Sequence, residues 1–486
     1  MTMRSGNHLL AVSMLSLFLG CSVKVPQTFL QLPELPPAPA TPRRNDAFIT
    51  RQGRMLLEDG RPFRFISVNV PNLHVVEDPS WRQLAQHPKG LTPDFWHRVT
   101  PFEQEDAIKS VAEMGGRVIR VYTLSIQGGR NNRKGPSHYL GPRMPLNEDL
   151  MCDYDSMIAL CGKHGVRLIL PFIDEWDWFG GRKEFAVLSG GGNFYTNPRV
   201  IRDFKALVEQ VLTRVNTVTG VAYKDDPTIL AWETGNELQG VPKAWTAEIA
   251  AWIKQLAPRQ LVADGATHSV DSIDDPNIDM VTDHFYESSG RNFIARTRAE
   301  GIRMGGTRPF YIGECGSMDP DLLAGTMLPA IHEGLAGALI WSLRFHAEDG
   351  GFYWHAEGGA ASAYHWPGRG RSDEAKVLAR LREAAWAIQG YQAPPREKPG
   401  TPVLLSFSTP SAIAWRGSAG AERYVLQRSR DGSQWTELAA DLSDMDGPFK
   451  PYTDRTAPEG ATLQYRLKAV NEAGESDWSN VVTMAP

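Results

Sequence analysis

Two glutamates, Glu237 and Glu314, each lie at or just beyond the end of a short run of β-prone apolar residues. The runs cover residues 229–237 and 310–316, and each predicts a strand whose carboxyl end presents a carboxylate to a cleft. Hydrolysis of a glycosidic bond needs such a pair from different strands. One carboxyl group protonates the leaving oxygen, and the other attacks the anomeric carbon or activates water. The alternative is that both are ordinary strand-end acids in salt bridges.

The elements that would position these acids form a regular series. From residue 48 onward, strand-like apolar runs alternate with amphipathic helical stretches. The predicted strands are 63–70, 117–123, 166–173, 229–236, 261–267, 280–286, 310–314 and 338–343. The helical stretches include 105–114, 149–164, 199–216, 244–256, 322–334 and 373–389. Residues 47–391 are therefore predicted to form an α/β fold, a (β/α)₈ TIM barrel with its active site at the carboxyl ends of the strands.

The first residues read as an export signal followed by a tether. Arg4 precedes an apolar stretch at 9–19 that is too short to span a bilayer, and Cys21 follows it. Residues 1–21 resemble a bacterial lipoprotein signal with Cys21 acylated, and simple signal cleavage is the alternative. The proline-rich segment 22–46 is expected to be an extended tether. We expect export to the outer membrane, on its periplasmic or outer side, or else secretion.

A second change of composition occurs in the proline-rich linker 392–401. Helical periodicity ends there, and short alternating strands follow at 412–415, 424–428, 435–438, 464–470 and 481–484. Residues 402–486 resemble a small all-β fibronectin type III sandwich, most clearly in 465–476. Such a module is expected to act as a spacer, with Trp415 in its core.

Composition and charge limit the classes of partner that the protein is expected to bind. The formal net charge is −5 and there are no basic runs, which argues against a nucleic-acid surface. No CxxC or HExxH spacing is present, so we predict neither a metal site nor a cofactor. The 14 Trp and 13 Tyr residues suit sugar rings, although most are expected in the core. A neutral polysaccharide is the expected substrate, and the membrane is expected to be contacted only through the lipid anchor.

The predicted barrel resembles glycoside hydrolase family five, and within it the β-mannanase branch. The most specific stretches are Phe194-Tyr-Thr-Asn-Pro, residues 211–220, and Tyr223-Lys-Asp-Asp-Pro-Thr-Ile-Leu-Ala-Trp-Glu. The resemblance implies that Glu237 is the general acid/base and Glu314 the nucleophile of a retaining mechanism. In that mechanism the two carboxyl groups are about 5–5.5 Å apart.

The two roles need different protonation states. Glu237 must be protonated at working pH, so we expect a partly desolvated site to raise its pKa. Glu314 must be ionised, and Arg120 and Tyr286 are the donors expected to hold it so. The family has an arginine and a tyrosine at these matching positions, and arginine keeps a neighbouring carboxylate charged. An ordinary barrel ion pair is the alternative for Arg120.

Four further residues are candidates for contacts to the sugar. Asn236 is expected to form a hydrogen bond with the sugar 2-hydroxyl. His284 is expected to contact a sugar hydroxyl or the acid/base, with a core histidine as the alternative. Trp341 resembles the tryptophan that forms the floor of the reacting sugar's subsite. Trp176 is a candidate for a neighbouring subsite, with core packing as the alternative.

The sequence departs from the family pattern at positions that bear on the choice of substrate more than on the type of reaction. Thr234-Gly235 precedes Asn236-Glu237 where the branch usually has a bulkier pair, Leu238 follows where it has a proline, and Cys315 replaces a common phenylalanine. Residues 127–146 could close one end of the cleft and favour exo cleavage. We expect a monomeric endo-β-1,4-mannanase acting on mannan or glucomannan. An exo-β-mannosidase, a β-1,4-glucanase and a non-catalytic glycan-binding lipoprotein are the alternatives.

Overall fold

The computed structural model describes most of the chain. The described residues are 34–39, 44–78, 96–129, 135–267, 272–286, 306–316, 327, 330, 332–355, 363–368, 373–445 and 451–485. The predicted signal at 1–21, part of the tether and most of the predicted helix 322–334 lie outside them.

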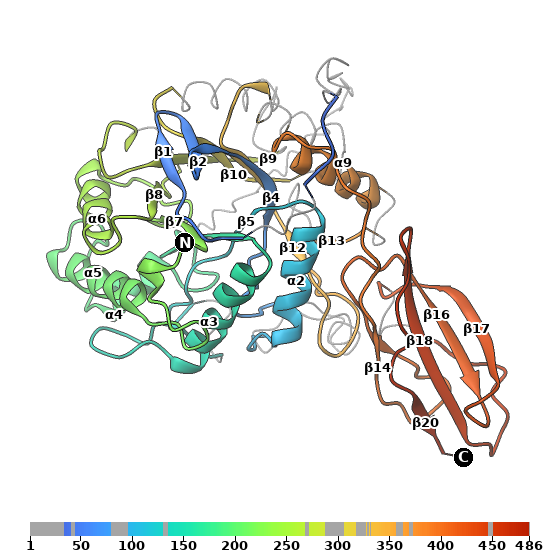
Figure 1. Ribbon diagram of the computed structural model, residues 1–486. Helices are drawn as coiled ribbons and strands as arrows, with labels where there is room; N and C mark the ends of the chain where they lie inside the picture. Colours follow the sequence, from blue (N-terminus) through green and yellow to red (C-terminus); the bar gives the residue numbers. More distant parts are fainter. Residues whose placement is uncertain are drawn as a thin grey trace, which may run out of the picture.

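Eight parallel strands close into a barrel, which confirms the predicted TIM barrel (Figure 1). Consecutive strands are neighbours, and the last pairs with the first. The strands are β4 (Phe65–Asn69), β5 (Val118–Arg120), β6 (Arg167–Pro171), β7 (Ile229–Glu233), β8 (Leu261–Asp264), β9 (Met280–Tyr286), β10 (Phe310–Gly316) and β11 (Gly337–Ile340). Nearly every residue in them is buried, because helices cover the outside and side chains fill the inside.

The helices begin at sequence signals that satisfy their free N–H groups. Thr100 and Glu103 form a capping box at α2, while Asn147 and Asn197 cap α3 and α5. The described α-helices are α2 (Pro101–Glu113), α3 (Glu148–Lys163), α4 (Arg182–Leu188), α5 (Pro198–Thr213), α6 (Lys243–Leu256) and α9 (Glu374–Ala387). A 3₁₀ turn, η3 (Tyr223–Asp225), precedes β7. The short α4 was not among the predicted helices.

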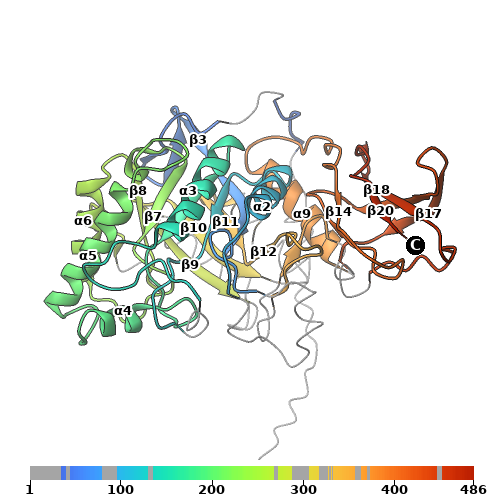
Figure 2. The ribbon, with the colours of Figure 1, turned by 90° about the horizontal axis from the view of Figure 1, so that it is seen from below.

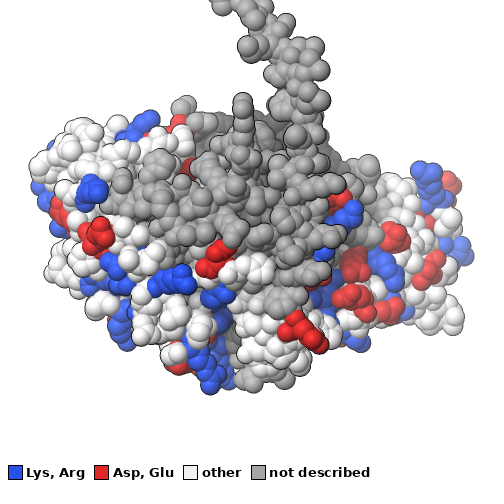
Figure 3. Space-filling view, turned by 90° about the horizontal axis from the view of Figure 1, so that it is seen from above, with Lys and Arg blue, Asp and Glu red and all other residues white. Residues whose placement is uncertain are grey.

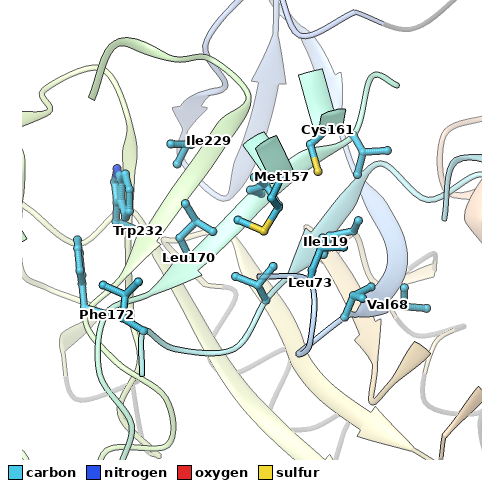
Figure 4. Packing of buried hydrophobic residues seen from close by; sticks show 14 of the residues in the cluster. Val68, Leu73, Ile119, Met157, Cys161, Leu170, Phe172, Ile229 and Trp232 are labelled. Atoms are coloured by element: carbon cyan, nitrogen blue, oxygen red, sulfur yellow. The ribbon is translucent and has the colours of Figure 1, made fainter. Parts of the chain in front are cut away.

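The apolar faces of the helices pack on the strands and form the main core. Figure 4 shows Met157 of α3 facing Leu170 and Ile119, which lie on neighbouring strands. A second cluster fills the barrel interior at the amino ends of the strands. This packing fixes the strands, so the residues at their carboxyl ends are held on a rigid frame.

An antiparallel sheet covers the amino-terminal end of the barrel, which the sequence did not predict. It consists of β1 (Thr50–Gln52), β2 (Met55–Glu58) and β3 (Arg61–Phe63). The predicted strand 63–70 is therefore divided: Phe63 ends a strand of this sheet, and the barrel strand starts at Phe65. Glu58 pairs with two arginines of the barrel, Arg117 and Arg167, and joins the sheet to it.

The C-terminal region is an all-β domain with its own core. One sheet has the order β17-β16-β18-β19, with β20 also paired to β18, and a small sheet joins β14 and β15. The strands are β14 (Val403–Leu404), β15 (Trp415–Arg416), β16 (Arg423–Ser429), β17 (Trp435–Leu442), β18 (Leu463–Asn471), β19 (Gly474–Glu475) and β20 (Val482–Met484). Trp415 is buried in this core, as predicted.

The all-β domain docks against the side of the barrel near α2 and α9, and the C-terminus lies at its far end (Figures 1 and 2). A buried histidine, His346, connects the two parts. Its Nδ1 lies 2.9 Å from Asp106 of α2, and its Nε2 lies 2.9 Å from Asp444 of the all-β domain. Gly417 comes so close that a Cβ there would lie 2.4 Å from the His346 ring.

The leading segment is also attached to this side. Gln392 donates its N–H to the carbonyl of Pro36 at 2.8 Å, and Pro37 forms a bridge with Gln392. Among the described residues, no helix is both long enough and apolar enough to cross a bilayer. On the described part of the face in Figure 3, charged side chains of both signs are interspersed.

Candidate active site

A bulge in β10 turns Glu314 toward the barrel axis. The pairing with β9 shifts between Ile312 and Glu314, so Gly313 is the extra residue, and Glu314 then lies opposite His284. A β-bulge redirects the side chain that follows it. A Cβ at Gly313 would lie 2.5 Å from the Thr282 hydroxyl and 2.8 Å from His284, so only glycine fits there without displacement.

Glu237 lies beyond β7, in a backbone conformation that few non-glycine residues adopt. Its φ is +50°, in the left-handed region. The flanking backbone holds this conformation. Asn236 donates its N–H to the Ile173 carbonyl at 2.7 Å, and Leu238 donates to Gly265 at 3.0 Å. Such strained residues gather at functional sites, where the surrounding structure over-determines them.

The departure from the family pattern at Gly235 has a local cause. Gly235 packs directly against Gly265, where an added Cβ would lie 1.6 Å from the Gly235 carbonyl oxygen. A side chain at Gly235 itself would meet Leu238 and the Ile173 carbonyl within 2.7 Å. The two glycines let the loops after β7 and β8 approach closely and bring Glu237 to its place.

The two glutamates lie close together at the carboxyl end of the barrel. Glu237, Glu314 and His284 each offer one ligand atom, and these atoms lie within 4.8 Å of one another. His284 lies between the carboxylates: its Nδ1 is 2.8 Å from Glu237 Oε1 and 3.4 Å from Glu314 Oε2. This position excludes the ordinary core-histidine alternative for His284. The close approach of the acids fits the short separation that a covalent glycosyl intermediate requires.

Arg120, which is 1% exposed, lies at the centre of the buried polar network. It donates from Nη1 to Glu314 Oε1 and from Nε to Glu233 Oε2, both at 2.8 Å. Its Nη2 donates to Asn236 Oδ1 at 2.7 Å. Tyr286 donates its hydroxyl to the other oxygen of Glu314. Both predicted donors thus contact Glu314, and the ion pair of Arg120 is part of the site.

The predicted rise in the pKa of Glu237 is wrong. Burial raises this pKa, but the hydrogen bond and positive charge of His284 outweigh it, and the Trp176 N–H adds to their effect. Together they lower the pKa of Glu237 to about 2. The sequence indicated a desolvated acid, but it did not show that two donors would converge on the same carboxylate.

The pKa values of Glu314 and His284 are shifted by burial and by the charge of the other group. Burial raises the pKa of Glu314, although the charges of His284 and Arg120 oppose this rise. For His284, burial favours the neutral ring, but the carboxylates of Glu314 and Glu237 outweigh it and raise its pKa. Within the pair of Glu237 and His284, the low pKa of the carboxylate and the raised pKa of the imidazole therefore place the proton on His284.

Asn236 acts as a bridge inside the network. Its Oδ1 accepts from Arg120, and its Nδ2 donates to Asp174 Oδ1 at 2.9 Å. Tyr122 donates its hydroxyl to the other oxygen of Asp174 at 2.6 Å. Burial raises the pKa of Asp174 to about 7. One amide hydrogen of Asn236 is left for the predicted contact to a sugar hydroxyl.

Aromatic rings border the acids. Trp176 is 48% exposed and donates its indole N–H to Glu237 Oε2 at 2.6 Å, so core packing is excluded for it. Trp341 is 7% exposed and packs beside Tyr122, with ring centroids 5.9 Å apart. Both tryptophans line a cavity of about 280 Å³. Rings placed in this way suit the C–H faces of pyranose units.

Several residues of the site were not predicted. Glu233 and Tyr311 form a buried pair behind Arg120, with the Tyr311 hydroxyl donating to the carboxylate. Asp174 also went unnoticed, although it directly follows the predicted strand 166–173. A signal existed for Glu233 and Asp174, because both are acids at or just after strand ends. Tyr311 had none, since it reads as an ordinary β-prone residue.

The cluster of Glu237, His284 and Glu314 has the composition of a cation site. However, Arg120 already places a permanent positive charge on Glu314, and Tyr286 donates to its remaining oxygen. The donors are therefore arranged for acid–base chemistry between carboxylates.

Comparisons with known proteins agree with this geometry. Residues 185–293 match the family model described as "GH family 5 beta-mannosidase-like". The chain is 32% identical over 272 residues to mannan endo-1,4-beta-mannosidase 1 of Oryza sativa subsp. japonica. This match covers 52% of the chain and 57% of the relative. Residues 185–293 of the barrel are thus similar to glycoside hydrolase family 5 β-mannosidase-like domains.

Further matches concern the same region and the same fold. The mannanase-like chain is 31% identical over 237 residues to mannan endo-1,4-beta-mannosidase 1 of Solanum lycopersicum, covering 46% of this chain and 53% of that one. The chain thus spans about half the length of the curated relatives it matches. The family-model match contains Glu237, His284 and Tyr286 but ends before Glu314.

Solved structures share the barrel. The endo-beta-1,4-mannanase from Thermotoga petrophila aligns with a TM-score of 0.55 at 18% identity, covering 88% of this chain and 98% of that one. The endo-1,4-beta-mannanase from Rhizomucor miehei aligns with a TM-score of 0.54 at 20% identity, covering 71% and 99%. At these identities the likeness shows the fold.

Proposed function

We propose that the protein is a retaining endo-β-1,4-mannanase that hydrolyses mannan or glucomannan. The observation that carries this proposal is the meeting of Glu237 and Glu314, with carboxylate oxygens within 4.8 Å, beside two tryptophans that line a cavity. The substrate class is taken from the plant relatives, which are named mannan endo-1,4-beta-mannosidases. No cofactor takes part in the proposed reaction.

In the first step, Glu314 attacks the anomeric carbon. A bond forms between its carboxylate oxygen and that carbon, and the glycosidic bond breaks with its electron pair on the leaving oxygen. Arg120 and Tyr286 each hold an oxygen of Glu314, which aims it and favours its charged form against the effect of burial. As the bond forms, the carboxylate of Glu314 becomes a neutral ester of the sugar. The positive charge of Arg120 stays beside this ester and stabilises it.

The leaving oxygen receives its proton from Glu237. Because the pKa of Glu237 is low and that of His284 is raised, the proton is shared by the pair through the 2.8 Å contact. The Glu237 side chain is 28% exposed, and a bound sugar would cover it. Further desolvation disfavours the carboxylate, so sugar binding moves the shared proton from His284 toward Glu237.

The second step reverses these roles. Glu237 takes a proton from water while the water oxygen attacks the anomeric carbon. The bond to Glu314 breaks, and the sugar leaves with its original configuration. Two displacements at one carbon give retention, which is a measurable consequence of the short distance between the acids.

The test is product analysis on mannohexaose, mannan, glucomannan and carboxymethylcellulose. A mixture of manno-oligosaccharides from the first three substrates, with β-configured new ends in early proton NMR spectra, is expected. Glu314→Ala should abolish turnover while oligosaccharide binding persists. Products only from carboxymethylcellulose would refute the mannan assignment and favour the β-1,4-glucanase. Mannose alone would favour the exo-β-mannosidase.

The non-catalytic alternative makes the opposite prediction. A glycan-binding lipoprotein would bind mannohexaose and release nothing from any β-linked glycan. The convergence of Arg120, Tyr286 and His284 on the two acids favours the enzyme, because sugar binding alone does not need a proton held between two carboxylates.

The flanking regions complete the proposal. We infer that residues 402–486 are a fibronectin type III-like spacer, supported by the antiparallel pairing of β16 with β17 and β18. We also propose export as an outer-membrane lipoprotein anchored through Cys21, on the basis of the apolar stretch at 9–19. The working form is proposed to be a monomer, since one chain supplies both acids.

A further inference from the structure

A second polar cluster borders the cavity that Trp341 and Trp176 line. The loop after β4 brings Glu77 and Asp78 together with His355, and one ligand atom from each lies within 4.8 Å of the others. All three residues are buried, and Glu77 and His355 both line the cavity. None of them has a role in the bond-breaking steps proposed above.

The two carboxylates of this cluster differ in the number of their hydrogen-bond partners. Asp78 accepts from Arg344 Nε at 2.5 Å, from Asn72 Nδ2 at 2.7 Å, and contacts His355 Nδ1 at 2.8 Å. These contacts account for both oxygens of Asp78 and explain its burial. Asp78 is therefore a structural anchor of the loop.

Glu77 lacks such partners. It is 6% exposed, and its Oε1 has only a long side-chain contact among the described residues, 3.5 Å from the Trp178 indole N–H, besides a hydrogen bond from its own backbone. Its Oε2 is buried and has no hydrogen-bond partner among the described residues. Leaving a buried carboxyl oxygen unpaired is costly, and such a group in a native cavity calls for a ligand.

We propose that Glu77 is a substrate-binding residue that holds the hydroxyl groups of a sugar unit inside this cavity. The inference rests on the proposed function, since it assigns a subsite of the same cleft. Glu77 supplies the polar contact, and Trp178, Trp176 and Trp341 supply apolar faces around it. A few polar groups in an aromatic pocket are the usual composition of a site for a small neutral ligand.

The chemistry of the pocket selects the ligand class. A carboxyl group accepts hydrogen bonds from two adjacent hydroxyls, which neutral pyranoses offer. Burial raises the pKa of Glu77 to about 8, with a further rise from the Asp78 charge, so below that pH the group also donates. A glutamine side chain reproduces this combination of one donor group and one acceptor, which gives the test its rescue variant.

A divalent cation is the competing occupant, because two carboxylates and an imidazole lie together. The contacts of Asp78 argue against it. Arg344 places a permanent positive charge 2.5 Å from one Asp78 oxygen, and His355 lies 2.8 Å from the other. A cation would have to displace or tolerate both groups.

The experiment measures mannohexaose binding by calorimetry in the inactive Glu314→Ala background. Glu77→Ala, added to it, should weaken binding about tenfold, the effect expected for one or two lost hydrogen bonds. Glu77→Gln should restore binding to within about threefold. In the active background, Glu77→Ala should raise KM while kcat changes much less. Glu105→Ala, which removes a glutamate that pairs with Lys163 on the outside of the barrel, is the control and should bind as wild type.

The outcomes separate this inference from the proposed function. Mannan hydrolysis by wild type with equal KM in both Glu77 variants would overturn the subsite and leave the enzyme assignment intact. Equal losses in Glu77→Ala and Glu77→Gln, with a lowered melting temperature, would show a structural role and overturn it too. A stoichiometric metal in the purified wild-type protein that is lost in Glu77→Ala would also overturn it. If wild type cleaves no mannan, the proposed function fails, and calorimetry still decides whether Glu77 binds the sugar.

Discussion

Replacing His346 is expected to weaken the attachment of the all-β domain in a pH-dependent way. The imidazole is 1% exposed and lies 2.9 Å from a carboxylate on each side, Asp106 on the barrel and Asp444 on the all-β domain. Burial alone would lower its pKa, but the two carboxylates outweigh burial and raise it to about 10. In His346→Gln the two acids lose the positive charge between them.

The expected loss of stability follows from the coupling between proton binding and folding. Each pKa unit corresponds to about 1.4 kcal/mol, so a rise from 6.5 to about 10 sets an upper bound of about 5 kcal/mol. Measured losses for broken buried pairs are about 3–5 kcal/mol, which supports the same range. Because the folded-state pKa is the higher one, the stabilisation is complete below about pH 6.5. It decreases as the pH rises and is lost as the pH passes through about 10.

The assay is calorimetric unfolding of wild type and His346→Gln at pH 6, 8 and 10. The difference in unfolding free energy should be largest at pH 6 and should shrink toward pH 10. Arg416→Gln is the matched control, because Arg416 pairs with Glu348 at the same junction and contains no imidazole. A difference for His346→Gln that stays equal at pH 6 and pH 10 would refute the reasoning.

Three further predictions concern the active site. Glu237→Ala should lower kcat on mannan about 10²–10⁴-fold, and far less on an aryl mannoside whose leaving group needs no proton; equal losses in initial-rate assays would contradict the acid role. His284→Asn should move the alkaline limb of the pH–rate profile, because wild type loses activity as the pH rises through the raised pKa of His284. An unmoved limb would count against the shared proton. Arg120→Met should destabilise the fold by about 3–5 kcal/mol, measured by urea unfolding, because Glu233 and Glu314 then lack their common cation. A loss below about 1 kcal/mol would show that the network is not structural.

The strands and the two acids could be predicted because both leave local signals. A barrel strand is buried on both faces and therefore reads as a continuous apolar run, as in residues 229–232. Glu314 lies near the end of β10 and Glu237 lies in the loop after β7, so both are at the carboxyl end of the barrel. Glu237 and Glu314 were thus identified, and the structure brings them together as the prediction required.

The remaining features depend on contacts between distant residues. The low pKa of Glu237 results from Trp176 and His284, which are 61 and 47 positions away in the sequence. Glu77 follows its strand by several residues and has no periodicity that singles it out. The sheet below the barrel was missed because Phe63 and Phe65 lie two residues apart and read as one strand.

The bond between Gln392 and Pro36 has a practical consequence for how the molecule can be held. Pro36 and Pro37 lie beside the interdomain linker, on the side of the barrel that carries the all-β domain. A surface that captures the protein through this segment would therefore hold the barrel from the side that carries the all-β domain.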